Sequence, residues 1–244
     1  MLLEADLHTH TIASGHAYST VKEIAEFASL KELKMIAITD HGIKMPGGPH
    51  EYYFSQIMGL PSSIYGVEIL KGVEANIIDQ HGNLDMPQRV LENLDLVLAS
   101  FHTDTGYQAG SVEQNTRALI AAIQNPFVHI ITHPGNPEFP VDLEKVAQAA
   151  KLAGKALEIN NSSFSLSRPG STPRCNHMAR IVAKTETIVS INSDAHSCFA
   201  VGSFDKALEA AEMAGIKPGR VLNTSVNLIK EYLTSLKQGL KKIS

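Results

Sequence analysis

Residues 35–41 read Met-Ile-Ala-Ile-Thr-Asp-His, an apolar run of strand length that ends in an acid and a histidine. Because successive residues of the run are apolar, both faces of the strand would be buried, as in a parallel sheet that is covered on both sides. The same pattern, an apolar run followed by a polar cluster, recurs along the chain. It predicts seven strands, at residues 2–7, 35–39, 69–73, 95–100, 128–132, 156–160 and 187–192.

Helical segments are predicted between most of these strands. Ser19 and Thr20 precede one such segment and would cap it, while Asp142 begins another that Gly154 would end. Strands that are mostly followed by helices, without hairpin signals, favour an α/β parallel barrel over an antiparallel sandwich. The predicted helices are residues 20–33, 87–93, 111–124, 142–153, 172–184, 204–214 and 225–236.

Composition limits the classes of function. The 244 residues carry a formal net charge of −4, which argues against a broad basic surface for long nucleic acids but leaves room for a narrow basic pocket. The two cysteines, Cys175 and Cys198, form no CxxC pair, so metal ligands would have to be nitrogen and oxygen atoms. A signal peptide and a membrane-length apolar run are both missing from the sequence, so we expect a cytoplasmic protein without a membrane partner.

The organisation of the chain predicts one domain over residues 1–244, because no repeat, low-complexity tract or linker divides it. The stretch from Gly42 to Gly66 is the long exception to the alternation of strands and helices. It contains several prolines, glycines and aromatic residues. A loop of this length commonly covers a site, and we expect the same here.

Histidines and acids gather at the predicted strand ends. In a parallel barrel all the carboxyl ends of the strands lie on one rim, where active sites form. Imidazoles and carboxylates that arrive together from many strands typically hold metal ions, and one zinc ion takes about four ligands. Nine residues of this kind are too many for one ion and suit two or three. These candidate metal ligands are His8, His10, His16, His41, Glu74, His102, His133, Asp194 and His196.

The alternative interpretation is that these histidines only form hydrogen bonds and hold no metal. It could explain a single histidine, but it explains the whole group poorly. Independent structural histidines would not all choose the same end of their strands. Asp6 and Asp40 flank candidate ligands and are interpreted as carboxylates that orient imidazoles. Four histidines lack this placement and are not expected to bind metal: His50, His81, His129 and His177.

Seven motifs carry a resemblance to a known family. They are HTHTIASGHAYST at residues 8–20, AITDHG at 37–42, KGVEAN at 71–76, SFH at 100–102, HIITHPGNP at 129–137, LEINNSS at 157–163 and SINSDAH at 190–196. Together and in this order they resemble the polymerase-and-histidinol-phosphatase (PHP) superfamily, most closely its bacterial YcdX-type phosphatases. The resemblance extends over nearly the whole chain and departs from the family at no ligand position.

The resemblance implies a distorted, TIM-like (β/α)7 barrel with a trinuclear metal centre at the C-terminal rim, usually of zinc, with manganese or iron as alternatives. It assigns His8, His10, Glu74 and Asp194 to one ion. It also assigns Glu74, His102 and His133 to a second, with Glu74 bridging. The third ion would be held by His16, His41 and His196.

A centre of this kind suits hydrolysis of phosphate esters. Bound metal ions acidify a coordinated water and neutralise an anionic substrate. We therefore predict a metal-dependent phosphatase that hydrolyses small phosphomonoesters, with Glu74 and Asp194 as catalytic residues. The sequence contains no GxSxG elbow and no GxxxxGK[ST] loop, which argues against a serine nucleophile and nucleotide-driven transfer.

Three other functions remain open at this point. A phosphodiesterase or nuclease could use the same centre, but the acidic charge argues against a long nucleic acid. An amidohydrolase-type C–N hydrolase also begins with HxH, but usually bridges its metals with a strand-end lysine, and here Ser100-Phe101-His102 ends the fourth strand. A metal-binding regulatory module without turnover is the third alternative. A homo-oligomer is compatible with the sequence.

Arg168 is the predicted contact for the phosphate. It lies in the loop after the sixth strand, whose end offers no histidine. The planar guanidinium fork suits two phosphate oxygens. A solvated loop arginine, or an ion pair with a helix carboxylate, is the competing interpretation.

Overall fold

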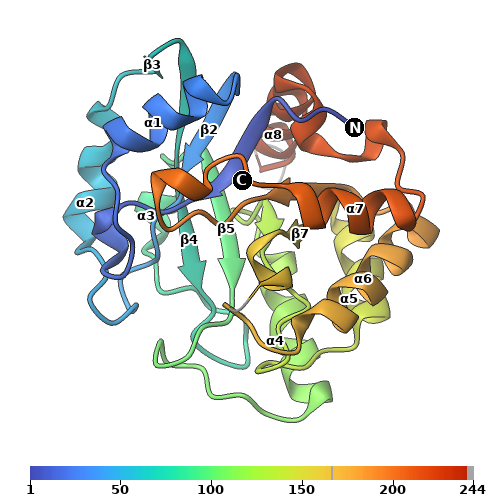
Figure 1. Ribbon diagram of the computed structural model, residues 1–244. Coiled ribbons are helices and arrows are strands. Elements are labelled where there is room, and N and C mark those ends of the chain that lie inside the picture. The colour runs from blue at the N-terminus through green and yellow to red at the C-terminus, as the bar shows by residue number, and fades with distance from the viewer. Residues whose placement is uncertain (166, 241–244) are drawn as a thin grey trace.

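Parallel strands form the centre of the computed structural model, which describes residues 1–165 and 167–240 (Figure 1). Seven of them pair side by side in the order β1-β2-β4-β5-β6-β7-β8, and β3 pairs only with β4. The strands are β1 (Ala5–Thr9), β2 (Met35–Ile38), β3 (Ser63–Ile64), β4 (Val67–Asn76), β5 (Leu96–Ser100), β6 (Ile130–Ile131), β7 (Ala156–Asn160) and β8 (Val189–Asn192).

The first and last strands come together and nearly close the sheet. Thr9 forms a parallel bridge with Ala195, and the backbone N–H of His10 donates to the carbonyl oxygen of Ala195 at 2.8 Å. The result is a distorted TIM-like barrel of parallel strands with flanking helices, so the predicted fold class is confirmed. Apolar runs such as 35–38 are buried throughout, because side chains on both faces of the strands are covered.

Helices cover the outside of the strands, with α1 and α2 on one side and α5, α6 and α7 on the other (Figure 1). They are α1 (Val21–Leu30), α2 (Glu51–Gln56), α3 (Gln88–Leu91), α4 (Val112–Gln124), α5 (Leu143–Ala153), α6 (Ser171–Thr185), α7 (Asp205–Met213) and α8 (Val226–Leu240). Short 3-10 helices are η1 (Ile12–Ser14), η2 (Ile57–Gly59), η3 (Ser162–Phe164), η4 (Cys198–Ala200), η5 (Pro218–Arg220) and η6 (Leu222–Thr224). Within the described ranges, every helix is too short or too polar to cross a lipid bilayer.

Local signals fix several helix ends as predicted. The Thr20 side chain accepts from the backbone N–H of Glu23, whose carboxylate accepts from the backbone of Thr20, which completes a capping box. Asp142 caps α5 through the backbone N–H of Lys145, and Gly154 ends it with φ of 66°.

Apolar side chains pack in two layers. The outer layer lies between the strands and the helices and includes Ile24, Ile36 and Val97. The inner layer fills the barrel, where Leu7, Leu98 and other strand residues meet Tyr232 and Leu233 of α8. Helix α8 therefore covers the amino-terminal ends of the strands and leaves their carboxyl ends free for polar residues.

Besides shifts of strand ends, such as β1 at Ala5–Thr9 where residues 2–7 were predicted, two local features differ from the sequence-based expectation. The expected absence of hairpins is wrong at residues 63–68, where β3 pairs antiparallel with β4 across Tyr65 and Gly66. Both turn residues have positive φ, 51° and 80°, which is the geometry of a two-residue hairpin turn. Helix α2 was also not predicted, because it is a short element inside the long loop of residues 42–66.

Candidate metal centre

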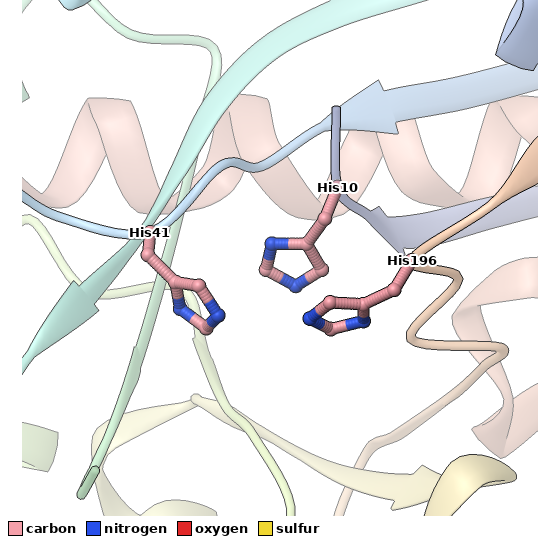
Figure 2. Close-up of side chains that lie close together, drawn as sticks. All are labelled: His10, His41 and His196. Carbon is pink, nitrogen blue, oxygen red and sulfur yellow. The ribbon is translucent and has the colours of Figure 1, made fainter. Parts of the chain in front are cut away.

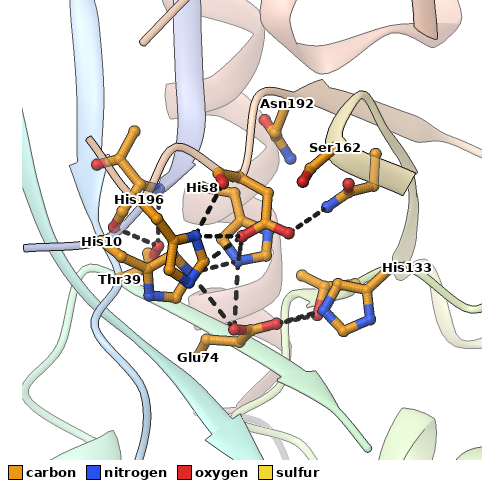
Figure 3. Close-up of polar contacts among 12 residues, drawn as sticks. His8, His10, Thr39, Glu74, His133, Ser162, Asn192 and His196 are labelled. Atoms are coloured by element: carbon orange, nitrogen blue, oxygen red, sulfur yellow. Dashed lines mark hydrogen bonds and ion pairs between the residues drawn. The ribbon is translucent and has the colours of Figure 1, made fainter. Parts of the chain in front are cut away.

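The nine candidate ligands meet at one rim of the barrel, near or after the carboxyl ends of their strands. Figure 3 labels five of them: His8, His10, Glu74, His133 and His196. His8 and Glu74 lie near the ends of β1 and β4, and His41, His102 and Asp194 follow β2, β5 and β8. His16 comes from the loop after η1. Only the folded barrel brings these residues together, because they are spread along the chain from His8 to His196, a separation of 188 positions.

An irregularity in β1 aims two of these histidines inward. Ala5 and Leu7 belong to the inner apolar layer, and the pairing of β1 with β2 shifts register between Asp6 and Thr9. Such a bulge reverses which side chains face inward. His8 and His10 therefore share the interior face, while Asp6 faces away from them and contacts Ser193 and Gly202.

One group of donor atoms comprises His8, His10 and Asp194. The Nε2 atoms of the two histidines lie 3.0 Å apart, and each lies close to Asp194 Oδ1, at 3.5 Å from His8 and 3.3 Å from His10. Glu74 Oε2 lies 3.3 Å from His8 Nε2. Of the four residues that the resemblance assigns to one ion, His8 therefore lies within 3.5 Å of the other three.

Glu74 is the centre of a second group. Its Oε2 atom lies 3.0 Å from His41 Nδ1 and 3.6 Å from His102 Nε2, and its Oε1 atom lies 2.8 Å from His133 Nε2. The carboxylate thus faces histidines from three different strands with its two oxygen atoms. Glu74 therefore lies between His8 of the first group and the histidines of the second, which is the position that a bridging ligand requires.

Three imidazoles form the outer group of the rim (Figure 2). The ring of His10 lies 4.3 Å from those of His41 and His196, centroid to centroid. His16 Nε2 lies 3.1 Å from His196 Nε2. The three sets with ligand atoms within 4.8 Å of one another are His10, His41 and His196; His8, His10 and Asp194; and His41, Glu74 and His102.

These residues fit metal ions, because several of their buried nitrogen and oxygen atoms lack the hydrogen-bond partner that a buried polar atom normally has. Among the described residues, His41 Nδ1, Glu74 Oε2 and Asp194 Oδ1 are buried without a hydrogen-bond partner. Leaving a buried polar atom unpaired costs about 1–3 kcal/mol, and more for a charged group. The atoms nearest to the two carboxylate oxygens are ring nitrogens, so a cation among them would satisfy both kinds of donor atom.

The electrostatics of the group also favour a cation. Burial raises the pKa of Glu74, but the neighbouring His8, His102 and His41 lower it further, so that it lies well below its ordinary value. Burial and the neighbouring His196 and His41 hold the pKa of His10 well below its ordinary value. Glu74 is thus a carboxylate and His10 a neutral imidazole, which are the forms that bind metal.

Hydrogen bonds behind the rim orient the imidazoles. His8 Nδ1 donates to Glu158 Oε1 at 2.7 Å, and His102 Nδ1 donates to Asn76 Oδ1 at 2.7 Å. His10 Nδ1 lies 3.0 Å from Ser14 Oγ, which itself donates to a carboxylate and must therefore accept from the ring. In each case the Nε2 lone pair is left facing the centre.

The predicted orienting role of two aspartates is corrected in part. Asp40 acts on His10 only through Ser14, whose hydroxyl donates to Asp40 Oδ1 at 2.7 Å. Asp6 contacts no imidazole among the described hydrogen bonds and instead holds the backbone N–H groups of Ser193 and Gly202. The register shift in β1 is the physical reason, since it turns Asp6 away from the row of His8.

Sequence reasoning missed the residues that do orient the ligands, Glu158 above all. Glu158 is fully buried in the middle of β7, between Leu157 and Ile159. A charged residue inside an apolar strand was the available signal, because buried acids need partners. Asn76 gave a weaker signal, at the end of the strand that carries Glu74.

Arg168 reaches the centre from the loop after β7. Its Nη1 atom donates to Asp194 Oδ2 at 2.9 Å, and the side chain is 14 % exposed. Burial lowers its pKa, but Asp194 and Glu74 raise it above the ordinary value, so the guanidinium stays charged. It is therefore neither a solvated arginine nor a partner of a helix carboxylate.

A pocket of about 790 Å³ opens above the histidines. Met45 of the long loop, Ser162 and Arg168 line it together with His16 and Asp194. The loop at residues 42–66 is tied to the centre by Tyr53, whose hydroxyl donates to Asp40. Through Met45 the loop forms part of the pocket wall, and a covering role for the whole loop stays a prediction.

The four histidines set aside from the sequence lie elsewhere. His50 accepts from the backbone N–H of Tyr52 at the start of α2. His81 and His177 are exposed. His129 is buried, and its Nδ1 atom accepts from the backbone N–H of Val97. None of the four is part of the described pocket lining.

Comparison with solved structures relates this barrel to known hydrolases. The histidinol phosphate phosphatase of Lactococcus lactis, solved with zinc, L-histidinol and phosphate, superposes with a TM-score of 0.66 at 16% identity, covering 89% of this chain and 95% of that one. A protein of Acinetobacter baumannii described as a probable 2-pyrone-4,6-dicarboxylic acid hydrolase has a TM-score of 0.55 at 10% identity, with 96% and 100% covered. At these identities the similarity establishes the fold alone.

Comparison of sequences is more specific. A probable phosphatase of Caldanaerobacter subterraneus subsp. tengcongensis is 53% identical over 231 residues, which cover 95% of this chain and 91% of the relative. A probable phosphatase of Thermoanaerobacter sp. strain X514 is 52% identical over 238 residues, covering 98% and 97%. The family model of the PHP domain matches residues 6–162, from the first strand to the loop after β7. With relatives this similar along almost their whole length, the chain belongs to the PHP family.

Proposed function

We propose that this protein is a phosphatase that hydrolyses small phosphomonoesters at a multinuclear metal centre. One observation carries the proposal: Asp194 and His41, each with an unpaired buried atom, line a pocket together with Arg168, and the unpaired Oε2 atom of Glu74 lies 3.0 Å from His41 Nδ1. Such a pocket combines positions for cations with a charged group for an anion. The relatives named probable phosphatases support the same activity.

The nine candidate ligands would hold three ions. Zinc is the proposed metal, since imidazole-rich sites suit it, with manganese and iron as alternatives that availability can favour. Glu74 would bridge two ions, because its two oxygen atoms face different histidines. Bound ions would supply a water of lowered pKa and neutralise charge on the phosphate.

The chain's own residues would bind and orient the substrate. Arg168 is charged and lies beside Asp194, so its free N–H groups can donate to phosphate oxygens at the same rim. Asp194 would hold Arg168 through one oxygen and a metal ion through the other. Residues 1–244 would act as one domain, since β1, β8 and α8 all contribute to a single barrel.

Small monoesters fit the pocket better than long nucleic acids. The outer wall carries the exposed acids Glu138 and Asp205, which would repel a polyanionic backbone. The net charge of −4 acts in the same direction. An amidohydrolase-type reaction is less well supported, because the end of β5 carries Ser100 and no lysine at the position where such enzymes bridge their metals.

The test is a substrate panel with metal analysis. Purified protein would be loaded with zinc, manganese or iron, its metal content measured, and its activity tested on phosphomonoesters, phosphodiesters and oligonucleotides. We expect more than one ion per chain and turnover of small monoesters. Cleavage of oligonucleotides without cleavage of monoesters would favour the nuclease, and at most one ion in active protein would exclude the multinuclear centre.

A further inference from the structure

Glu158 is the fully buried acid of β7, and it lies behind the proposed ligands rather than among them. Four N–H groups surround its carboxylate. Oε1 accepts from His8 Nδ1 at 2.7 Å and from Asn192 Nδ2 at 2.8 Å. Oε2 accepts from the backbone N–H of His133 and from Asn160 Nδ2, both at 2.9 Å. Every described partner of Glu158 is thus a donor.

The two amide donors cannot turn over to become acceptors. Asn192 Oδ1 already accepts from the backbone N–H of Leu7 at 3.0 Å. Asn160 Oδ1 accepts from the backbone N–H of Ser163 at 2.9 Å. Because a backbone N–H can only donate, both side chains must direct their NH2 groups at Glu158. The carboxylate therefore lies in a cage of N–H groups. A donor group at the same position would find no acceptor among the two amides and the backbone N–H.

His8 is the one member of the cage that can change. A neutral imidazole carries its proton on either nitrogen, and the partner of one nitrogen decides the state of the other. With Nδ1–H donating to Glu158, the Nε2 lone pair points at His10, Glu74 and Asp194. With the proton on Nε2, that nitrogen could not bind a metal ion.

We propose that Glu158 is a positioning residue that selects the Nδ1–H form of His8 and so creates the metal-binding atom of the group formed by His8, His10 and Asp194. The inference rests on the proposed metal centre. It adds a residue to that centre that contacts no ion and no substrate. Asn160, which also donates to Asp194 Oδ2 at 3.2 Å, links the same cage to a second member of the group.

Replacement of Glu158 by Gln tests the proposal without changing volume. The amide oxygen of Gln would face the backbone N–H of His133, because that donor cannot change. Its NH2 group would then face His8 Nδ1 and Asn192 Nδ2. Because Asn192 cannot turn over, only His8 can respond, by taking the form with the proton on Nε2. We expect Glu158→Gln to lose affinity at one ion by about 10- to 100-fold, the usual effect of a lost partner behind a metal ligand. The ions of the other two groups should remain.

The measurement is a zinc titration with metal analysis of the folded protein, run on the wild type, Glu158→Gln and Glu209→Gln. Glu209 is exposed on α7 and its side chain makes no described hydrogen bond, so its variant should match the wild type. Equal affinity and stoichiometry in Glu158→Gln would overturn the inference. So would a uniform loss at all ions, since that would mean general support of the barrel.

A second measurement needs no variant of Glu158. In ¹⁵N-histidine-labelled wild-type protein with zinc bound, NMR should show the His8 ring protonated at Nδ1, with the resonance assigned by its loss in His8→Ala. Protonation at Nε2 would refute the proposed role. If the wild type binds no zinc, the proposed metal centre is wrong. If the wild type binds zinc and hydrolyses monoesters, and Glu158→Gln has the same zinc affinity and the same activity, only the inference about Glu158 fails.

Discussion

At the scale of single residues, the two oxygen atoms of Glu74 face different sets of nitrogen atoms. Oε1 is hydrogen-bonded to Ser100, Thr132 and His133, whereas Oε2 has no hydrogen-bond partner among the described residues and lies near His8 and His41. This division is what the proposed bridge between two ions requires. It also makes Glu74 the side chain whose loss should disturb the centre most.

Glu74→Gln should therefore lower metal content and turnover together. The Gln side chain has the same volume as Glu. It places an NH2 group, which cannot bind a cation, where a carboxylate oxygen now faces ring nitrogens. We expect turnover to fall by at least about 100-fold, from loss of a direct metal ligand. His177→Gln is the matched control, because His177 is exposed on α6. Equal activity of Glu74→Gln and wild type at saturating zinc would refute the bridge.

Arg168→Ala should separate binding of the substrate from binding of the metal. The guanidinium touches Asp194 Oδ2, while the unpaired atom of that carboxylate is Oδ1. We expect KM for a phosphomonoester to rise by about 10-fold or more, as one charge-assisted hydrogen bond is lost, with zinc content unchanged. Steady-state kinetics and metal analysis on the same sample would show this. Unchanged KM and kcat would leave the phosphate to the metal ions alone.

At the scale of elements, helix caps connect the flanking helices to the rim. Helix α7 begins without a cap of its own, and Asn161 from the loop after β7 accepts from the backbone N–H groups of Lys206 and Ala207, at 3.0 and 3.1 Å. Asn161 thus fixes both the helix and the beginning of the loop that carries Arg168. Ser111, by contrast, caps α4 within its own segment.

Asn161→Ala and Ser111→Ala should have similar effects on stability and different effects on catalysis. Each removes one cap, so the free energy of unfolding should fall by about 1 kcal/mol in both. KM should rise only in Asn161→Ala, because only that variant releases the loop of Arg168. Urea denaturation and kinetics of the two variants test this. A rise in KM for both, or for neither, would contradict the link between α7 and the pocket.

At the scale of the whole molecule, the end of the barrel opposite the metal centre is closed by α8. The hydroxyl of Tyr232 donates to the carbonyl of His129 at 2.6 Å and accepts from the backbone N–H of Ala156 at 2.9 Å. The imidazole of His129 is buried beside these bonds, and burial, together with Lys155 and Lys237, lowers its pKa to about 3. This buried histidine ties the stability of the barrel to pH.

The sign of the effect follows from proton binding. Below about pH 6.5 the unfolded chain protonates this histidine, whereas the folded chain does so only near pH 3, so unfolding takes up a proton and becomes easier as pH falls. His129→Gln should flatten the fall in the free energy of unfolding by up to about 1.4 kcal/mol per pH unit across this window. Urea denaturation at several pH values measures the slope, and His177→Gln should leave it unchanged. Parallel curves for wild type and His129→Gln would contradict this assignment.

The sequence by itself determined the fold class and the placement of the candidate site residues. Apolar runs such as 35–38 and 156–160 determine buried parallel strands, because only covered sheets bury both faces of a strand. The motifs at their ends carried the family resemblance, which the comparisons confirm, and the relatives named probable phosphatases support the predicted hydrolase. Capping signals at Thr20 and Asp142 predicted the beginnings of two helices, because a helix cap depends only on residues that are close in the chain.

Only the tertiary structure decided which atoms face one another. The register shift in β1 turned Asp6 away from His8, and no periodic pattern in the sequence predicts such a bulge. The contact between Arg168 and Asp194 joins residues that are 26 positions apart, and the donors around Glu158 lie 2 to 150 positions from it in the chain. Such contacts depend on how strands and loops pack, so the sequence determined which residues reach the rim and the packing decided what each of them does there.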